Sequence, residues 1–156
     1  MSGDTVVASA WRASAQPRTS LVAGAQLVAL HSIVESRGQL DVAQVGRELP
    51  FPVRRIFMIS HVPRQDVRGE HAHRELHQFL ICAHGQVTVE VSDGRSSRVV
   101  VLDSSDVGLH IAPMVWASQH SYSADAILVV LASAEYDAAD YIRSHDDYLA
   151  ARRVAT

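Results

Sequence analysis

Short apolar runs separated by turn residues make up most of the chain from Gln26 onward. The runs are built from Val, Ile, Leu and Phe, which favour extended structure. The segments between them carry residues typical of tight turns, at positions 36–38 (Ser-Arg-Gly), 50–52 (Pro-Phe-Pro), 92–94 (Ser-Asp-Gly) and 103–106 (Asp-Ser-Ser-Asp). This spacing predicts many short β-strands joined by turns.

The clearest hairpin spans the middle of the chain. Residues 86–91 and 97–102 flank an Asp-Gly turn, and this dipeptide supplies the positive φ angles that a tight hairpin needs. Val87, Val89 and Val91 alternate with polar residues and therefore share one face of the first strand. We expect this face to point into the core.

The pattern changes towards the C-terminus. Residues 126–132 (Ala-Ile-Leu-Val-Val-Leu-Ala) form a continuous apolar run, which predicts a strand buried on both faces. Residues 135–143 and 146–153 instead have acids leading into basic residues, as expected for one or two short helices. Strands followed by a small helical segment suit a sandwich or barrel whose open end holds a site.

The N-terminal residues show neither strand alternation nor a helical stripe. Residues 1–24 are rich in Ala, Ser, Thr and Gly, and we predict that they form a flexible tail. Residues 25–152 then form one domain. The 156 residues suit a single domain, and the 47% hydrophobic content suffices for a core without staples.

Charge and cysteine content narrow the range of partners. The net charge of -3 comes from 14 basic and 17 acidic residues spread along the chain, so no basic stripe predicts binding to nucleic acid or membrane. The single cysteine, Cys82, lies in an apolar run and is interpreted as a core residue. No run is long enough to span a membrane, which predicts a cytoplasmic protein whose partner is a small molecule or a second copy of itself.

A histidine pair carries the candidate chemistry. His71 and His73 are two residues apart, so on a strand both side chains point to the same face and could converge on a ligand. Together with Gly69, Gln78 and Gly85, they approximate the first motif of the cupin fold. The predicted fold is therefore all-β, a double-stranded β-helix (cupin or jelly roll) with short C-terminal helices.

A metal site is an alternative use of the same segment. His77 shares the parity of His71 and His73 if the strand continues, and three imidazoles could hold a divalent metal such as Fe, Mn, Ni or Zn. The stretch 113–118, where metal-binding cupins place a further histidine, contains none, which disfavours this hypothesis. A chance pair on a polar strand face is the third possibility.

Six ordered motifs over residues 26–150 identify a family. The chain resembles the cupin-type nucleotide-sugar 3,4-ketoisomerases, the WxcM-like sugar ketoisomerases that act on dTDP-4-keto-6-deoxyglucose. The motifs are Ser36-Arg37-Gly38-x-Leu40, Leu49-Pro50-Phe51-x-Val53-x-Arg55, Arg68-Gly69-x-His71-Ala72-His73-x4-Gln78, Asp93-Gly94, Gly108-Leu109-x3-Pro113-Met114-x-Trp116, and Val130-Leu131-Ala132-Ser133-x2-Tyr136-x3-Asp140-Tyr141-Ile142-Arg143.

The resemblance implies an isomerase of unusual deoxysugar biosynthesis that needs no metal or other cofactor. It also implies a homodimer with exchanged N-terminal strands, a dTDP-linked keto-sugar as substrate, and His71 and His73 as the catalytic residues. A proton leaves C3 and returns at C4 through an enediol, and an imidazole with a pKa near neutrality suits both transfers. The sequence leaves open which histidine is the carbon base.

The same resemblance suggests the residues that bind the substrate. Arg37, Arg55 and Arg68 are candidates to hold the diphosphate, because guanidinium groups match phosphate oxygens in two-point geometry. Gln78 would orient a histidine or a sugar hydroxyl. Trp116 would pack against the sugar or base, although core packing explains it equally well.

Three positions depart from the family pattern. Phe57 and Met58 stand where the family commonly has two tyrosines, and Ala117 stands where it commonly has His or Arg. These losses suggest a changed substrate or product, or weakened catalysis. Two alternatives therefore stand beside the isomerase: a non-catalytic nucleotide-sugar-binding cupin, and a metal-dependent cupin enzyme that uses His71, His73 and His77.

Overall fold

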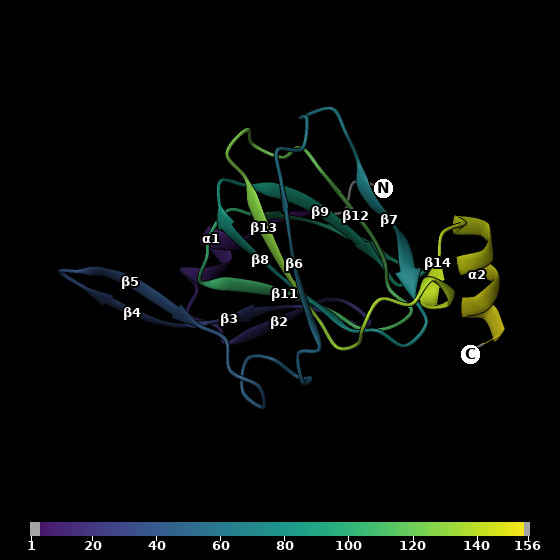
Figure 1. Cartoon of the computed structure of the whole chain (residues 1–156), viewed down its shortest axis with the longest axis horizontal. Helices are drawn as coiled ribbons and strands as arrows, with labels where there is room; N and C mark the ends of the chain where they lie inside the picture. Colours follow the sequence, from purple (N-terminus) through teal and green to yellow (C-terminus); the bar gives the residue numbers. More distant parts are fainter. Residues whose placement is uncertain (1–3, 155–156) are drawn as a thin grey trace.

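Two facing β-sheets form the body of the protein in a computed structural model that describes residues 4–154 (Figure 1). Apart from one parallel pair between β1 and β10, the named strands pair in an antiparallel manner. The first sheet has the order β1 (Thr5–Val7), β10 (Ser97–Leu102), β9 (Val87–Ser92), β12 (Trp116–His120), β7 (Arg68–His73) and β14 (Tyr141–Ile142). The second has the order β2 (Arg18–Val22), β3 (Ala25–Ala29), β11 (Val107–Ile111), β8 (Gln78–His84), β13 (Ile127–Ala132) and β6 (Arg55–Ser60). This arrangement confirms the predicted all-β fold.

The core lies between the two sheets and is built as the alternation predicts. Val87, Val89 and Val91 on β9 are fully buried, and β9 pairs with β10 in the expected hairpin. The prediction for β13 was wrong on one point, because only its inner face is buried. Leu128 and Val130 are at most 1% exposed, whereas Ile127 on the other face is 38% exposed. The outer face of this sheet is only partly covered by other elements, so the apolar run does not imply burial on both sides.

The N-terminal segment does not behave as the predicted tail within the described residues. β1 pairs with β10, β2 pairs with β3, and the short helix α1 (Ala8–Arg12) joins them. Ala8 is fully buried, and the Trp11 indole N–H donates to the Thr19 hydroxyl at 2.7 Å. The segment shows no sequence period because it is divided between two sheets and one helical turn. Residues 1–3 lie outside the described part of the chain.

The C-terminal segment contains the predicted helices and one strand that was not predicted. A short 3₁₀ helix (Ala138–Asp140) leads into β14, and helix α2 (His145–Val154) follows. Tyr148 on α2 is fully buried, and its hydroxyl donates to the carbonyl of Ser92 at 2.9 Å. No helix among residues 4–154 is long and apolar enough to cross a membrane.

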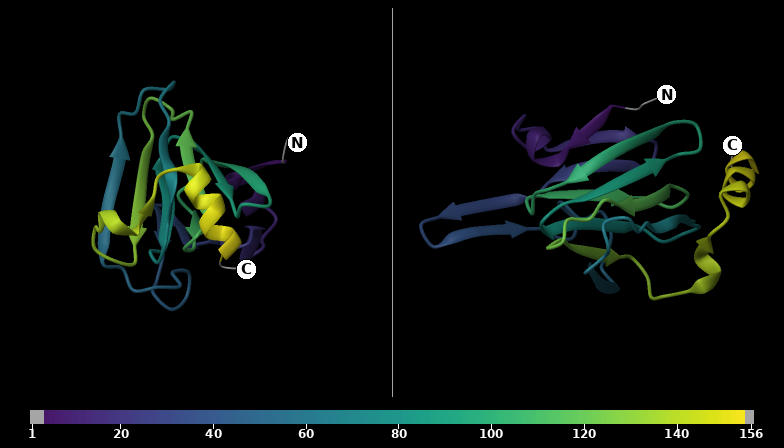
Figure 2. Two further views of the ribbon diagram at one scale, coloured as in Figure 1. Left: turned by 90° about the vertical axis from the view of Figure 1, so that its right-hand side faces the viewer. Right: turned by 90° about the horizontal axis from the view of Figure 1, so that it is seen from above.

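One hairpin stands apart from both sheets. β4 (His31–Glu35) and β5 (Gly38–Val42) pair only with each other among the described strands. They project from the body at the end opposite to α2 (Figure 2).

Candidate active site

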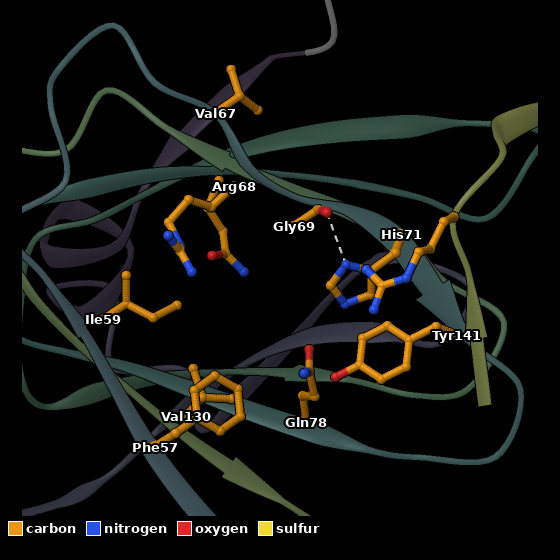
Figure 3. Close-up of a pocket in the computed structure, with 11 residues that line it drawn as sticks. Phe57, Ile59, Val67, Arg68, Gly69, His71, Gln78, Val130 and Tyr141 are labelled. Atoms are coloured by element: carbon orange, nitrogen blue, oxygen red, sulfur yellow. Dashed lines mark hydrogen bonds between the residues drawn. The ribbon is translucent and has the colours of Figure 1, made fainter. Parts of the chain in front are cut away.

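A pocket of about 370 Å³ opens between the two sheets. Its walls come from both sheets and from the C-terminal segment (Figure 3). The lining residues are Phe57, Ile59, Val67, Arg68, Gly69, His71, Gln78, Gln119, Val130, Tyr141 and Arg143. The sequence-predicted residues His71, Arg68 and Gln78 are therefore brought together.

An irregularity in β7 directs His71. Gly69 has φ +81°, and a Cβ atom there would lie 3.0 Å from the carbonyl oxygen of Ala117 on the neighbouring strand. Glu70 also has a positive φ of 52°, and the register with β12 shifts at this point. Such a bulge changes the direction of the following side chain. Gly69 is thus required both by its backbone angle and by the close approach of β12.

His71 is poised as a base. Its Nδ1–H donates to the carbonyl oxygen of Gly69 at 2.9 Å, and because a carbonyl can only accept, the unprotonated lone pair must be on Nε2. Burial lowers the pKa of His71 more than this hydrogen bond raises it, and the charge of Arg143 lowers the pKa further. His71 is therefore neutral at pH 7 and able to accept a proton.

His73 occupies a different environment. It is only 5% exposed and does not line the pocket. Its Nδ1–H donates to the Asp140 carboxylate at 2.8 Å, while its buried Nε2 has no hydrogen-bond partner among the described residues. Burial lowers the pKa of His73 to about 4, although the Asp140 carboxylate opposes this effect. The two histidines of the motif are not equivalent.

Tyr141 connects the two histidines. Tyr141 in β14 is the pairing partner of His73 in β7. The centroid of its ring lies 4.8 Å from that of His71 and 4.4 Å from that of His73. The guanidinium of Arg143 lies 4.3 Å from the centre of the Tyr141 ring. Asp140, Tyr141 and Arg143 stand in one family motif of the sequence, but the charge pattern there predicts a short helix and gives no sign that these residues reach the histidines.

The ionisable side chains that line the pocket include no acidic residue. Arg68 and Arg143 line it, and no Asp or Glu is among the lining residues. Gln78 and Gln119 supply amide groups and are only 7% and 6% exposed. Two guanidinium groups without a competing carboxylate suit an anionic ligand such as a diphosphate.

Three predicted binding residues lie outside this pocket. The Arg55 guanidinium packs over Phe57 and Tyr136, with 5.4 Å and 5.6 Å to the ring centres. Trp116 packs in the small cluster around Tyr148, with ring centroids 5.5 Å apart. Arg37 is exposed near the tip of the β4–β5 hairpin.

The three-histidine metal hypothesis is wrong about His77. β7 ends at His73, and the chain bends before β8 begins at Gln78, so the parity assumed for His77 is lost. His77 instead stacks on His110, with Nδ1 and Nε2 3.0 Å apart, and both rings contact Phe51. Residues 4–154 contain no group of three or more His, Cys, Asp or Glu side chains that could hold a metal ion.

The three departures from the family pattern lie in three different environments. Phe57 lines the pocket, so a ring is retained there without a hydroxyl group. Met58 points away on the outer side of β6 and is 70% exposed. Ala117 is buried beside β7.

Comparison with known proteins identifies the family. The family model described as FdtA, WxcM-like, C-terminal, matches residues 23–153. The chain belongs to this family. A TDP-4-oxo-6-deoxy-alpha-D-glucose-3,4-oxoisomerase from Aneurinibacillus thermoaerophilus is 37% identical over 123 residues, which cover 79% of this chain and 88% of the relative. The predicted resemblance is confirmed.

Solved structures of sugar 3,4-ketoisomerases have the same fold as this chain. The sugar 3,4-ketoisomerase QdtA from Thermoanaerobacterium thermosaccharolyticum, in complex with TDP, matches with a TM-score of 0.83 and 31% identity over 86% of this chain and 98% of that one. The TDP-quinovose 3,4-ketoisomerase WlaRB from Campylobacter jejuni matches with 0.80 and 34% identity over 83% and 99%. A histidine-to-asparagine mutant of QdtA is in complex with TDP-4-keto-6-deoxyglucose.

Proposed function

We propose that this protein is a nucleotide-sugar 3,4-ketoisomerase that moves the keto group between C4 and C3 of a TDP-4-keto-6-deoxyhexose. The observation that carries the proposal is the unprotonated Nε2 of His71, held in a pocket with Arg68 and Arg143 and no lining carboxylate. The relatives are named as 3,4-oxoisomerases or 3,4-ketoisomerases of TDP-linked sugars, which supports the same substrate class here. No finding supports a non-catalytic binding protein.

His71 is the proposed carbon base. The C4 ketone acidifies the hydrogen on C3, and the neutral His71 removes it as a proton to form an enediol. Return of this proton to C4 leaves the ketone at C3. C3 is oxidised and C4 is reduced within one sugar, so the reaction needs neither an external oxidant nor a reductant.

The proposed substrate contacts follow from the pocket. Arg68 and Arg143 bind the diphosphate, and the amide of Gln78 orients a sugar hydroxyl. Arg55 does not line the pocket, because its guanidinium packs on the ring of Phe57. For Arg55 to contact the diphosphate, its side chain has to move past Phe57. Trp116 supports the C-terminal helix.

The proposed assembly is a homodimer with exchanged N-terminal strands. An isolated two-stranded hairpin is at best marginally stable, yet β4 and β5 extend from the body and expose Val34 at 74% and Leu40 at 58%. β6 is the bare edge of its sheet and exposes Ile56 and Met58. Packing of the hairpin against a second copy would cover both apolar surfaces and carry Arg37 towards the partner's pocket. The proposed location is the cytoplasm.

Two measurements test these proposals. NMR of TDP-4-keto-6-deoxyglucose with the protein in D₂O is expected to show a 3-keto product, with deuterium at C4 to the extent that the proton on His71 exchanges with solvent before it returns. Binding of TDP without any change in the sugar would instead indicate a binding protein. Light scattering is expected to give a dimer, and Val34→Asp with Leu40→Asp is expected to give a monomer; a monomeric wild type would contradict the assembly.

A further inference from the structure

The isomerisation needs a second proton carrier that the histidine motif does not supply. While His71 moves the proton between the carbons, O4 must gain a proton and O3 must lose one. The second histidine is badly placed for this, because His73 does not line the pocket and its Nε2 is buried. Arginines stay protonated at any working pH, and amides do not exchange protons on the time scale of catalysis. The phenol of Tyr141 is the remaining lining group with a transferable proton.

We propose that Tyr141 is the catalytic residue that carries the oxygen proton, with His73 and Asp140 as positioning residues behind it. This inference rests on the proposed isomerase function. In Figure 3 the hydroxyl of Tyr141 points into the cavity beside His71 and towards Gln78. The imidazole and the phenol can therefore face the same end of a bound sugar.

The surroundings of Tyr141 hold its ring in place. Its backbone pairs with His73 in β14, and the His73 ring packs against it at 4.4 Å. The Asp140 carboxylate fixes His73 by accepting from Nδ1 and also accepts from the backbone N–H of Glu75. Asp140 thus ties β14 to β7 and acts on the reaction only through this packing.

Tyr141 and its neighbour Arg143 line the same cavity. The Arg143 guanidinium packs against the Tyr141 ring, 4.3 Å from the ring centre. On another wall of the same pocket, Phe57 presents a ring without a hydroxyl. One tyrosine hydroxyl therefore lines this pocket.

The proposed steps balance without any further reactant. His71 Nε2 takes the proton from C3, the C–H electrons form the C3=C4 bond, and the C4 carbonyl electrons move to O4, which takes the proton of Tyr141. The Tyr141 phenolate then removes the proton from the O3 hydroxyl. The O3 electrons form the C3=O bond, and the C3=C4 electrons take the proton from His71 at C4. Both side chains return to their starting states.

Replacement of Tyr141 by Phe tests the proposal, because it removes only the hydroxyl. We expect kcat for TDP-4-keto-6-deoxyglucose to fall by about 100-fold, as is typical for loss of an acid–base group. TDP affinity is expected to stay within about twofold, since the ring is retained. Tyr136→Phe is the matched control: this ring is 62% exposed, lies outside the pocket, and its variant should keep wild-type kcat.

A rescue variant separates chemistry from packing. Phe57→Tyr in the Tyr141→Phe background restores a phenol to the same pocket and is expected to recover about tenfold in kcat. Wild-type kcat in Tyr141→Phe would overturn the role of Tyr141 while leaving the isomerase function intact. If the wild type itself shows no turnover, the proposed function fails instead, so the two failures are distinguishable.

Discussion

Two pairs of contacting histidines, His71 with His73 and His77 with His110, serve different purposes. His71 and His73 contact each other at a centroid distance of 4.9 Å, and His77 and His110 stack at 5.3 Å. In both pairs burial lowers the pKa, to about 4 for His73 and for His110. Only the first pair includes a side chain that reaches the pocket.

The difference shows that a lowered pKa does not by itself mark the reactive histidine. His77 and His110 are held by Phe51 on the outer side of a sheet, and the Gln26 amide contacts the second ring nitrogen of His110. They satisfy each other as a packing unit. His71 differs because its Nδ1 is occupied by a backbone carbonyl while its Nε2 lies in a pocket with two arginines.

Replacement of His71 should give the largest effect. We expect His71→Asn to lower kcat by about 10³-fold, because it removes the base that takes the C3 proton. Deuterium exchange at C3 of the substrate is expected to disappear, with TDP binding retained by the arginines. His77→Asn is the matched control and should keep kcat within about twofold. An equal fall of kcat in His71→Asn and His77→Asn would contradict the view that only the first pair takes part in the reaction.

Both histidine pairs should make the free energy of unfolding decrease at acidic pH. The pKa values of His73 and His110 fall from 6.5 in the unfolded chain to about 4 in the folded protein, so the unfolded state binds more protons between these pH values. The contribution of these two neutral histidines to the free energy of unfolding is therefore fully present above pH 6.5. It is lost as the pH falls towards 4, by at most about 3 kcal/mol for each group.

Urea unfolding from pH 7 to pH 4.5 measures this dependence. His110→Gln removes one of the two groups, so we expect a shallower loss of the free energy of unfolding with unchanged kcat at pH 7. An unchanged slope would show that His110 does not remain neutral in the folded protein.

The smallest effect is expected at Asp140. Asp140→Asn keeps an oxygen that can accept from His73 but removes the charge, so the pKa of His73 should fall further. We expect kcat to fall by about tenfold with unchanged TDP affinity. NMR titration of the His73 ring reports the pKa independently of activity. Asp146→Asn, on the exposed start of α2, is the control; an unaltered His73 titration would contradict the role of the pair.

Much of this protein is determined by local sequence. Alternating residues predicted the β9–β10 hairpin and its buried valines, and Gly69 with His71 and His73 placed the site on a strand, because a period of two fixes which residues share a face. The ordered motifs identified the family. The hairpin and the histidine pair depend on neighbours within a few positions, and the motifs depend only on the order of residues along the chain, so all of them can be recognised in the sequence alone.

Only the tertiary structure decided how the site is divided among its residues. The bulge opposite Ala117 turns His71 into the pocket, and Asp140, 67 positions away, holds His73 behind it. β14 was not predicted because two residues show no period, yet it brings Tyr141 to both histidines. Such contacts depend on which strands pair across the sheet, and the spacing of residues along one strand carries no information about that choice.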